Sequence, residues 1–416
     1  MSKKKKSGFS GHENKVQDKQ RRNLFNQKIE QVCNAIAGPG YFKKLRPEAL
    51  NSMYACRYPV LKAKAEPGTD IPKSKVIQYN KLMNKFIGDI PVDLENGNSI
   101  PLGLYLSEGL LLINCMAELA ENHTGDMDHF IAPFRDYFQG TESDEVIIEM
   151  LNVLVSDTNI FLSDLNHSII YADITRTACF DKETTFNDIF IREFRPERSS
   201  IIIDGEKRSL IRVGWIGWAD EKMEWSWAKV KPSAIGFKTG SLDIPLDVYI
   251  QQHALNSLQE RIDITPGILH YLVFAIFMQE DIPHHKYNSH TLVECKLSDQ
   301  KAGYFLVTLN DAKLIIRTFL FLTNDGTPEG EKLRKLLEIN KEDKQYLMID
   351  KLPTFNSYHI EKNERLSKLF TDAGCGSLLK LGHLKEYSQK DIRDKDPESI
   401  LKYLSDAEYF KGLSEG

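Results

Sequence analysis

The hydrophobic periodicity of the chain changes near residue 160, and this change constrains the fold more than any other feature of the sequence. Before that point, apolar residues recur every three or four positions, as they do on one face of an α-helix. Helices are predicted at about 23–37, 47–54, 75–86, 106–119, 128–138 and 143–154. Beyond residue 165, β-branched and aromatic residues alternate with polar ones, which is typical of strands. The sequence therefore predicts an α+β protein.

The predicted strands fall into two groups. The first group forms a central antiparallel β-meander at 199–203, 209–219 and 223–231, with Asp204-Gly205 as a hairpin turn. The second group forms a three-stranded antiparallel sheet at 291–297, 304–309 and 313–323, after helices at 245–262 and 266–278. Thr327 and Pro328 are typical of the N-cap and the first residue of another helix.

These patterns predict four parts along the chain. They are a basic disordered tail at 1–22, an α-helical domain at 23–160, a β-meander region at 161–240 and an α+β domain at 241–416. With 416 residues, of which 41% are hydrophobic, the chain has enough apolar side chains for more than one core.

Two observations bear on localisation. No apolar stretch near the N-terminus could act as the core of a signal peptide, and the six cysteines are scattered without a C-x-x-C pair, as expected of reduced, buried thiols. The apolar segments 100–116 and 268–278 are interrupted by polar residues or shorter than the roughly 20 residues that span a bilayer, so we expect buried helices. These features predict a cytoplasmic protein without a membrane partner.

The standard signatures of cofactor and metal chemistry are missing from the sequence. It contains no P-loop, no G-x-G-x-x-G fingerprint, no H-E-x-x-H and no G-x-S-x-G, so we expect no cofactor. Asp281, His284, His285, His290 and Cys295 are residue types that can bind zinc. The adjacent histidines point in two directions in an extended loop and no second cluster completes four ligands, so no metal site is predicted.

Three further features each allow a binding and a structural interpretation. All four tryptophans lie within 215–227, which fits either a platform for bases or sugars, or packing within the sheet. The basic residues of 1–22 fit contact with nucleic acid or a solvated leader. The turn 324–330 fits anion binding at a helix N-terminus or simple capping.

The candidate chemistry centres on the predicted helix 245–262. A spacing of four residues predicts a polar stripe beside the apolar one, formed by Tyr249, His253, Ser257 and Arg261. A histidine and an arginine on one helix suit metal-independent cleavage of a phosphodiester. The histidine moves the proton of a ribose 2′-hydroxyl, and the arginine stabilises the charge that develops on the phosphorus.

The last predicted strand could supply the other half of such a site. Lys313, Arg317 and Thr323 share one face of 313–323 if alternation is strict. We therefore predict His253, Arg261 and Arg317 as catalytic residues, and Tyr249, Lys313 and Thr323 as substrate-binding residues.

The segment 246–323 resembles a known group of ribonucleases. Its run His253-Ala254-Leu255-Asn256-Ser257-Leu258-Gln259-Glu260-Arg261-Ile262, followed by a helix and antiparallel strands, is similar to the H-A-x-x-R-x-x-x-R helix of the RelE-like and colicin-type ribonuclease toxins. Ser257 stands where that pattern has its first arginine. The resemblance implies a metal-independent endoribonuclease of toxin or effector type that acts on RNA. It also implies His253 as acid or base, and Arg261 and Arg317 as phosphate ligands.

A different class of function fits the same residues. Any amphipathic helix needs a polar face, and His253 and Arg261 also fit its solvated edge, with Arg261 paired to Glu260. The net charge of −5 counts against tight RNA binding. The alternative is therefore a non-enzymatic binding or structural protein of a mobile element, phage or regulatory complex, with protein partners. The sequence does not indicate an oligomeric state.

Overall fold

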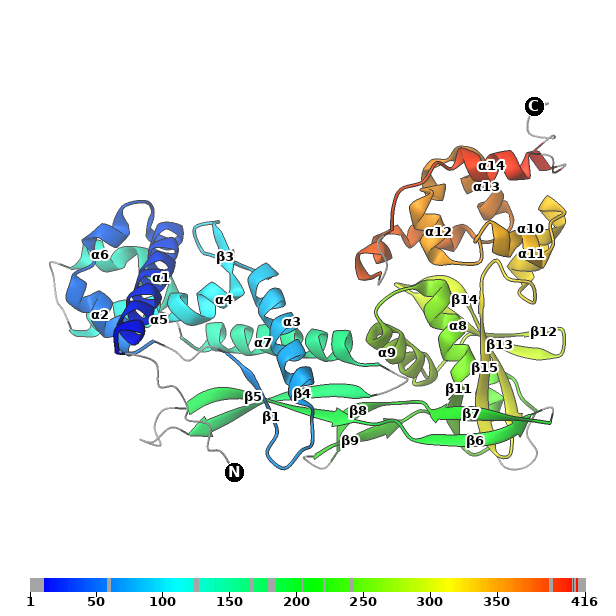
Figure 1. The fold of residues 1–416 in the computed structure, drawn as a ribbon, viewed down its shortest axis with the longest axis horizontal. Helices are drawn as coiled ribbons and strands as arrows, with labels where there is room; N and C mark the ends of the chain where they lie inside the picture. Colours follow the sequence, from blue (N-terminus) through cyan, green and yellow to red (C-terminus); the bar gives the residue numbers. More distant parts are fainter. Residues whose placement is uncertain are drawn as a thin grey trace, which may run out of the picture. The chain divides into compact units, whose positions relative to one another are not determined.

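The computed structural model describes most of the chain and divides it into two compact units. The described residues are 11–57, 61–122, 127–138, 140–164, 168–178, 185–203, 205–219, 222–238, 243–388, 392–405, 407 and 409–410. Unit 1 comprises Met1–Thr158 and Ala172–Arg192, and unit 2 comprises Asn159–Tyr171 and Glu193–Gly416. The fold is α+β, as predicted, with helices dominating the N-terminal part and a sheet in the C-terminal part (Figure 1).

Unit 1 is built around two long helices that pack against each other. Ile29, Val32 and Cys33 of α1 share a core with Leu112 and Met116 of α5. The helices of this part of the chain are α1 (Gly11–Ala37), α2 (Pro47–Ala55), α3 (Lys73–Asp89), α4 (Leu102–Leu104), α5 (Leu110–Asn122), α6 (Asp128–Ile131) and α7 (Gly140–Leu162), with single turns η1 (Tyr41–Lys44), η2 (Tyr105–Gly109) and η3 (Ala132–Tyr137).

Two details of unit 1 bear on the sequence-based predictions. Residues 11–22, which the sequence assigned to a disordered tail, form the first part of α1, whereas 1–10 lie outside the described residues. In the described part of the chain, one helical stretch, Leu102–Asn122, is long and apolar enough to cross a membrane. Its buried residues pack against α1, in agreement with the predicted buried helix.

Two small sheets are built mainly from strands of unit 1, although the start of β4 and the end of β5 belong to unit 2. A three-stranded sheet has the order β1-β5-β4, from β1 (Ala63–Ala65), β5 (Thr185–Phe194) and β4 (Ile169–Ala178). A short antiparallel pair joins β2 (Pro91–Asp93) to β3 (Ser99–Pro101).

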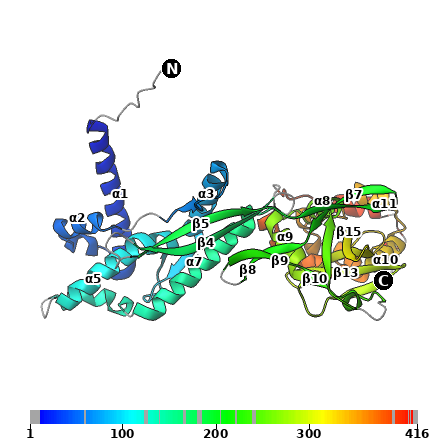
Figure 2. The ribbon, with the colours of Figure 1, turned by 90° about the horizontal axis from the view of Figure 1, so that it is seen from below.

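Unit 2 contains a large mixed sheet that places the candidate site. Its strand order is β12-β13-β14-β15-β11-β7-β6, and β10 pairs with β11. The strands are β6 (Arg198–Ile203), β7 (Glu206–Arg212), β10 (Lys229–Val230), β11 (Leu246–Gln251), β12 (His284–Tyr287), β13 (His290–Leu297), β14 (Gln300–Asn310) and β15 (Lys313–Phe321). A separate ribbon is made by β8 (Gly214–Ala219) and β9 (Lys222–Trp227) (Figure 2).

The three predicted C-terminal strands are confirmed as the antiparallel neighbours β13, β14 and β15, but they belong to a wider sheet. β11 adds to β15 in parallel, with Val248 opposite Leu314, and β7 and β6 follow on its other side. The sheet thus takes strands from both 161–240 and 241–416. At the predicted β6–β7 hairpin turn, Gly205 has the left-handed φ of 79° and Asp204 lies outside the described residues.

The predicted helix at 245–262 is wrong in its first third. Residues 246–251 form β11, and α8 begins at Gln252 and ends at Ile262. Val248 and Ile250 lie in the main core while Tyr249 packs with Leu210 and Ile315, as alternation along a strand requires. Ile250 and Ala254 are four residues apart, as on one face of a helix. The helical pattern in the sequence therefore extends into residues that form the strand.

The remaining helices of unit 2 cover the sheet and form a C-terminal layer. They are α9 (Pro266–Phe277), α10 (Pro328–Leu337), α11 (Lys341–Tyr346), α12 (Leu352–Ser357), α13 (Glu364–Asp372) and α14 (Glu398–Leu404), with turns η4 (Pro232–Ile235), η5 (Ile360–Lys362), η6 (Gly376–Lys380) and η7 (Gly382–Tyr387). Phe321 of β15 contacts Phe355 of α12, which contacts Phe370 of α13. Aromatic packing therefore joins this layer to the end of the sheet.

Candidate functional site

A cavity of about 350 Å³, lined mostly by polar residues, lies in unit 2. It is lined by α8, β15, the turn after β15, helix α11 and Asp350 beyond that helix. The lining residues are His253, Ser257, Arg261, Thr318, Leu320, Asn324, Asp325, Lys341, Lys344, Gln345 and Asp350. Sites for small molecules have volumes of about 300–1,000 Å³, so the cavity could hold a ligand the size of a nucleotide.

α8 places His253, Ser257 and Arg261 in this cavity because they are four residues apart and share one face of the helix. The neighbouring face carries the core residues Ala254, Leu255, Leu258 and Ile262. His253 is exposed and Ser257 is buried. The predicted polar stripe is therefore present from His253 onwards. Because the apolar stripe packs into the core, the polar stripe faces the cavity.

β15 contributes different residues from those predicted because its pairing with β14 is irregular. Ile316 lies opposite Val307, and Thr318 lies opposite the next residue of β14, Leu306. Arg317 is therefore an extra residue of β15, as in a β-bulge. The bulge breaks the strict alternation from which the shared face of Lys313, Arg317 and Thr323 was predicted. Thr318 and Leu320 are the residues of β15 that line the cavity.

The other predicted site residues lie elsewhere. Tyr249 is buried in β11, and the Lys313 ammonium lies 4.9 Å from the centre of its ring. Thr323 follows the end of β15 and is fully buried, where its hydroxyl donates to the Ile349 carbonyl at 2.8 Å. The structure thus brings His253 and Arg261 together, while Tyr249, Lys313, Arg317 and Thr323 are not among the residues that line the cavity.

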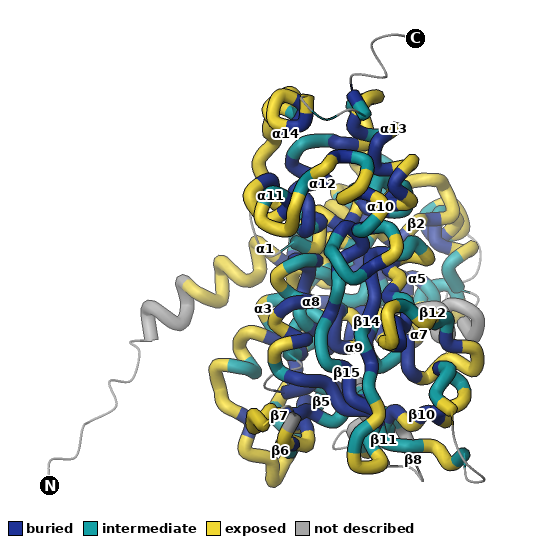
Figure 3. Tube along the Cα trace, turned by 90° about the vertical axis from the view of Figure 1, so that its right-hand side faces the viewer, coloured by how far each residue is buried: buried dark blue, intermediate teal, exposed yellow. Residues whose placement is uncertain are grey.

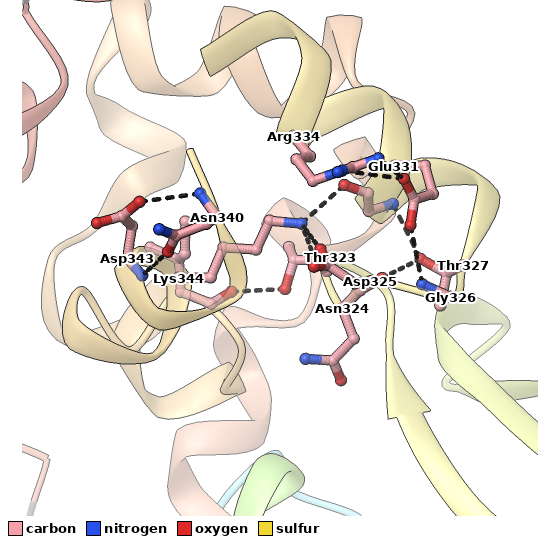
Figure 4. Close-up of polar contacts among 12 residues, drawn as sticks. Thr323, Asn324, Asp325, Gly326, Thr327, Glu331, Arg334, Asn340, Asp343 and Lys344 are labelled. Atoms are coloured by element: carbon pink, nitrogen blue, oxygen red, sulfur yellow. Dashed lines mark hydrogen bonds and ion pairs between the residues drawn. The ribbon is translucent and has the colours of Figure 1, made fainter. Parts of the chain in front are cut away.

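Lys344 holds the turn that follows β15, one of the segments that line the cavity (Figure 4). Its side chain is 2% exposed. Its ammonium donates to the Thr323 carbonyl at 3.1 Å, to Oδ1 of Asp325 at 2.5 Å and to the Gly330 carbonyl at 2.8 Å. Because a buried ammonium needs a partner for each hydrogen, these contacts restrict the turn to one conformation.

Helix caps begin the two helices that follow this turn. Thr327 caps α10, accepting from the Gly330 amide at 2.9 Å, and Pro328 is the first helical residue, as predicted. Asn340 and Asp343 cap α11 reciprocally, each accepting from the other's amide at 2.9 Å. The turn 324–330 therefore caps a helix, which is one of the two roles that its sequence allows.

Arg261 and Asp350 form the inner, charged part of the cavity. Burial lowers the pKa of Arg261, and the Asp350 and Glu260 carboxylates oppose this shift. Burial also raises the pKa of Asp350, against the attraction of Arg261 and Lys351. Nη1 of Arg261 and Oδ1 of Asp350 are both buried, and neither has a hydrogen-bond partner among the described residues. Such orphaned groups cost about 1–3 kcal/mol each, which a ligand could recover.

Glu260, which the sequence offered as a partner for Arg261, accepts a hydrogen bond from Lys351 at 2.5 Å. The sequence did not reveal Lys341, Lys344, Gln345 or Asp350 as site residues. The Asn340-x-x-Asp343 capping pattern could have located α11, but its distance in sequence from α8 hid their proximity.

The other sequence candidates do not form comparable sites. His284 donates from Nδ1 to the Ile282 carbonyl at 2.9 Å, His285 contacts Glu294 at 2.8 Å, and Cys295 is buried in the core. Within the described ranges, no group of three or more His, Cys, Asp or Glu residues could hold a metal ion.

The tryptophans of the β8–β9 ribbon make packing contacts. The rings of Trp225 and Trp227 stack with centroids 4.6 Å apart, and the Arg212 guanidinium lies 4.5 Å from the Trp227 ring. Trp215 packs edge-on against His270. The side chain of Trp218 lies outside the described residues.

No family model matches the sequence, and neither the curated proteins nor the solved structures include one that is significantly similar to it.

Proposed function

We propose that unit 2 cleaves RNA by metal-independent acid–base chemistry in the cavity between α8, β15 and α11. One observation carries the proposal. His253, Ser257 and Arg261 line the same cavity as the lysines of α11, and Nη1 of Arg261 has no hydrogen-bond partner among the described residues. A proton-transfer group and an unused guanidinium donor are the two elements that cleavage through a ribose 2′-hydroxyl requires.

The residues of the cavity have distinct roles in this reaction. His253 accepts the proton of the 2′-hydroxyl, and the 2′ oxygen forms a bond to the adjacent phosphorus. The bond from phosphorus to the 5′ oxygen breaks, and that oxygen takes a proton from water. Arg261 donates from Nη1 to a non-bridging phosphate oxygen, whose negative charge grows in the transition state. The products end in a 2′,3′-cyclic phosphate and a 5′-hydroxyl.

The charges of the cavity are compatible with an anionic substrate despite its two carboxylates. The Asp325 carboxylate accepts a hydrogen bond from the buried Lys344, and the positive charge of Arg261 attracts the Asp350 carboxylate. Lys341 is exposed at the edge of the cavity, where its charge attracts a phosphate.

The proposal is tested with a defined oligoribonucleotide in the presence of EDTA. Wild-type protein should cut it and leave a 2′,3′-cyclic phosphate, detected by mass spectrometry. A matched oligonucleotide with a 2′-deoxyribose at the cleaved position should remain intact there. Cleavage at the deoxyribose, 5′-phosphate ends or loss of activity in EDTA would contradict the mechanism. Binding of RNA without cleavage would favour the non-enzymatic alternative.

A further inference from the structure

A cationic surface lies in unit 1, which contains none of the residues that line the cavity. Residues 17–24 of α1 are all exposed, and Figure 3 draws this stretch in the colour of exposed residues. Asp18 and Arg22 of this stretch contact α2. The exposed cations of α1, of η1 and of the residues that flank α2 define what we call the basic surface: Lys19, Arg21, Arg22, Lys43, Lys44, Arg46 and Arg57.

The charge of this region is opposite to that of the whole protein. Residues 11–57 contain nine Lys or Arg and four acidic residues, whereas the chain carries a net charge of −5. A concentrated positive segment in an acidic protein attracts polyanions locally. The acidic side chain Asp18 is already engaged, since it accepts from Arg22 at 3.3 Å and from the Tyr54 hydroxyl at 3.1 Å.

Two guanidinium groups of the basic surface are held on one aromatic ring. The guanidinium carbons of Arg22 and Arg57 lie 4.7 Å and 4.1 Å from the centre of the Tyr54 ring. Arg22 also donates to Asn51 at 2.9 Å, and Arg57 donates to the Tyr54 carbonyl at 2.5 Å. Because these contacts already restrict both side chains, a ligand loses less conformational entropy on binding them.

The basic surface is long enough for several successive phosphates. α1 rises about 1.5 Å per residue, so Arg22 and Ala37 are about 22 Å apart along the helix. Arg22 and Arg57 lie near one end of this length. Lys43, Lys44 and Arg46 come just after the C-terminal end of α1, where the Tyr41 amide donates to the Gly38 carbonyl.

We infer that the basic surface binds the backbone of single-stranded RNA. A membrane surface fits less well, because an interfacial helix needs an apolar face and Leu24 is the only apolar residue of the exposed stretch 17–24. Guanidinium planes can also stack on unpaired bases, which single-stranded RNA presents. The inference concerns binding by unit 1 and does not depend on cleavage in unit 2.

The test uses the full chain carrying His253→Ala, so that RNA is not cut, and a fluorescent single-stranded RNA of mixed sequence. Anisotropy titrations at several KCl concentrations give the slope of log affinity against log salt. Replacing Arg22, Lys44 and Arg57 by glutamine should reduce the magnitude of this slope by about 2, at about 0.7 for each lost phosphate contact. A second triple variant, Lys19→Gln, Arg21→Gln and Arg46→Gln, keeps the Tyr54 arrangement and should have the same effect.

The matched control removes three exposed lysines of unit 2, with Lys332→Gln, Lys335→Gln and Lys362→Gln, and should keep the wild-type slope. Equal slopes for all three variants would overturn the inference. So would binding to phosphatidylserine vesicles without binding to RNA. Salt-dependent binding that the basic surface controls, together with no cleavage by protein that retains His253, would overturn the proposed function alone.

Discussion

Lys344 is a buried cation whose partners belong to the turn beside the cavity and to the first turn of α10. We predict that Lys344→Met destabilises unit 2 by about 3 kcal/mol, because it leaves two buried carbonyls and the Asp325 carboxylate without their donor. The estimate is at the low end for a broken ion pair because the Asp325 side chain is 30% exposed and can turn to water.

Urea unfolding measures this effect. The control is Lys341→Met, which removes an exposed ammonium from the same helix and should change stability by less than about 0.5 kcal/mol. Equal stabilities for the two variants would show that the turn does not depend on Lys344.

His270 makes stability depend on pH. Burial lowers the pKa of its imidazole to about 3, and Nε2 donates to the Gly214 carbonyl at 2.9 Å. The unfolded chain binds the proton near the ordinary pKa of about 6.5, so the stability is complete above that pH and is lost as the pH falls from 6.5 towards 3. Lowering the pH from 7 to 5 should cost about 2 kcal/mol through this residue.

The measurement compares urea unfolding of wild type and His270→Gln at pH 7 and pH 5. Glutamine cannot titrate and can still donate to a carbonyl, so the variant should lose less stability on acidification. If both proteins lose the same amount, the imidazole is not the source of the effect.

Lys341 lies at the exposed edge of the cavity and is expected to attract substrate without taking part in the chemistry. We predict that Lys341→Ala raises KM for RNA about fivefold, equivalent to ~1 kcal/mol, and leaves kcat unchanged. Steady-state kinetics at low salt measure both constants, with Lys335→Ala as the control on another exposed helix surface. A fall in kcat at constant KM would instead place Lys341 in the transition state.

At the scale of elements, α8 shows what the sequence predicts well. Its two stripes follow from residue spacing alone, and His253 and Arg261 were predicted on that basis. Its start at Gln252 could not be predicted, because Val248 to Ile250 form a strand by pairing with β15. That pairing is not visible in the local sequence. The bulge at Arg317 was equally hidden, because it depends on the register between β14 and β15.

The contact between α9 and the end of α7 depends on Gly267. A Cβ at this position would lie 1.5 Å from the Ile160 carbonyl oxygen, so the two backbones are in direct contact. Gly267→Ala should therefore destabilise unit 2 by about 3 kcal/mol or more, because helix backbones must separate. Thermal unfolding is the measurement.

Gly217→Ala is the matched control, because a Cβ there lies 3.8 Å from the nearest atom, the Cβ of Ser226. This variant should unfold close to the wild-type temperature. Similar melting temperatures for Gly267→Ala and wild type would mean that α9 does not approach α7 in this way.

At the scale of the whole molecule, the α+β class and the three C-terminal strands follow from local patterns. The assembly of the sheet does not, because β11 and β15 are parallel neighbours separated by two helices and three strands. The cavity likewise joins segments more than 80 residues apart, which explains why α11 and Asp350 were missed. Local periodicity identified the face of α8 that lines the cavity but not the residues opposite it.

The central claim is that His253 performs the proton transfer in this cavity. The most direct test is the single-turnover rate of cleavage of one oligoribonucleotide in EDTA by wild type, His253→Ala and His290→Ala, an exposed histidine outside the cavity. We predict that His253→Ala lowers the rate at least ~100-fold, as loss of a general base does, while His290→Ala leaves it unchanged. Cleavage by His253→Ala at the wild-type rate, or no cleavage by any of the three proteins, would contradict the account.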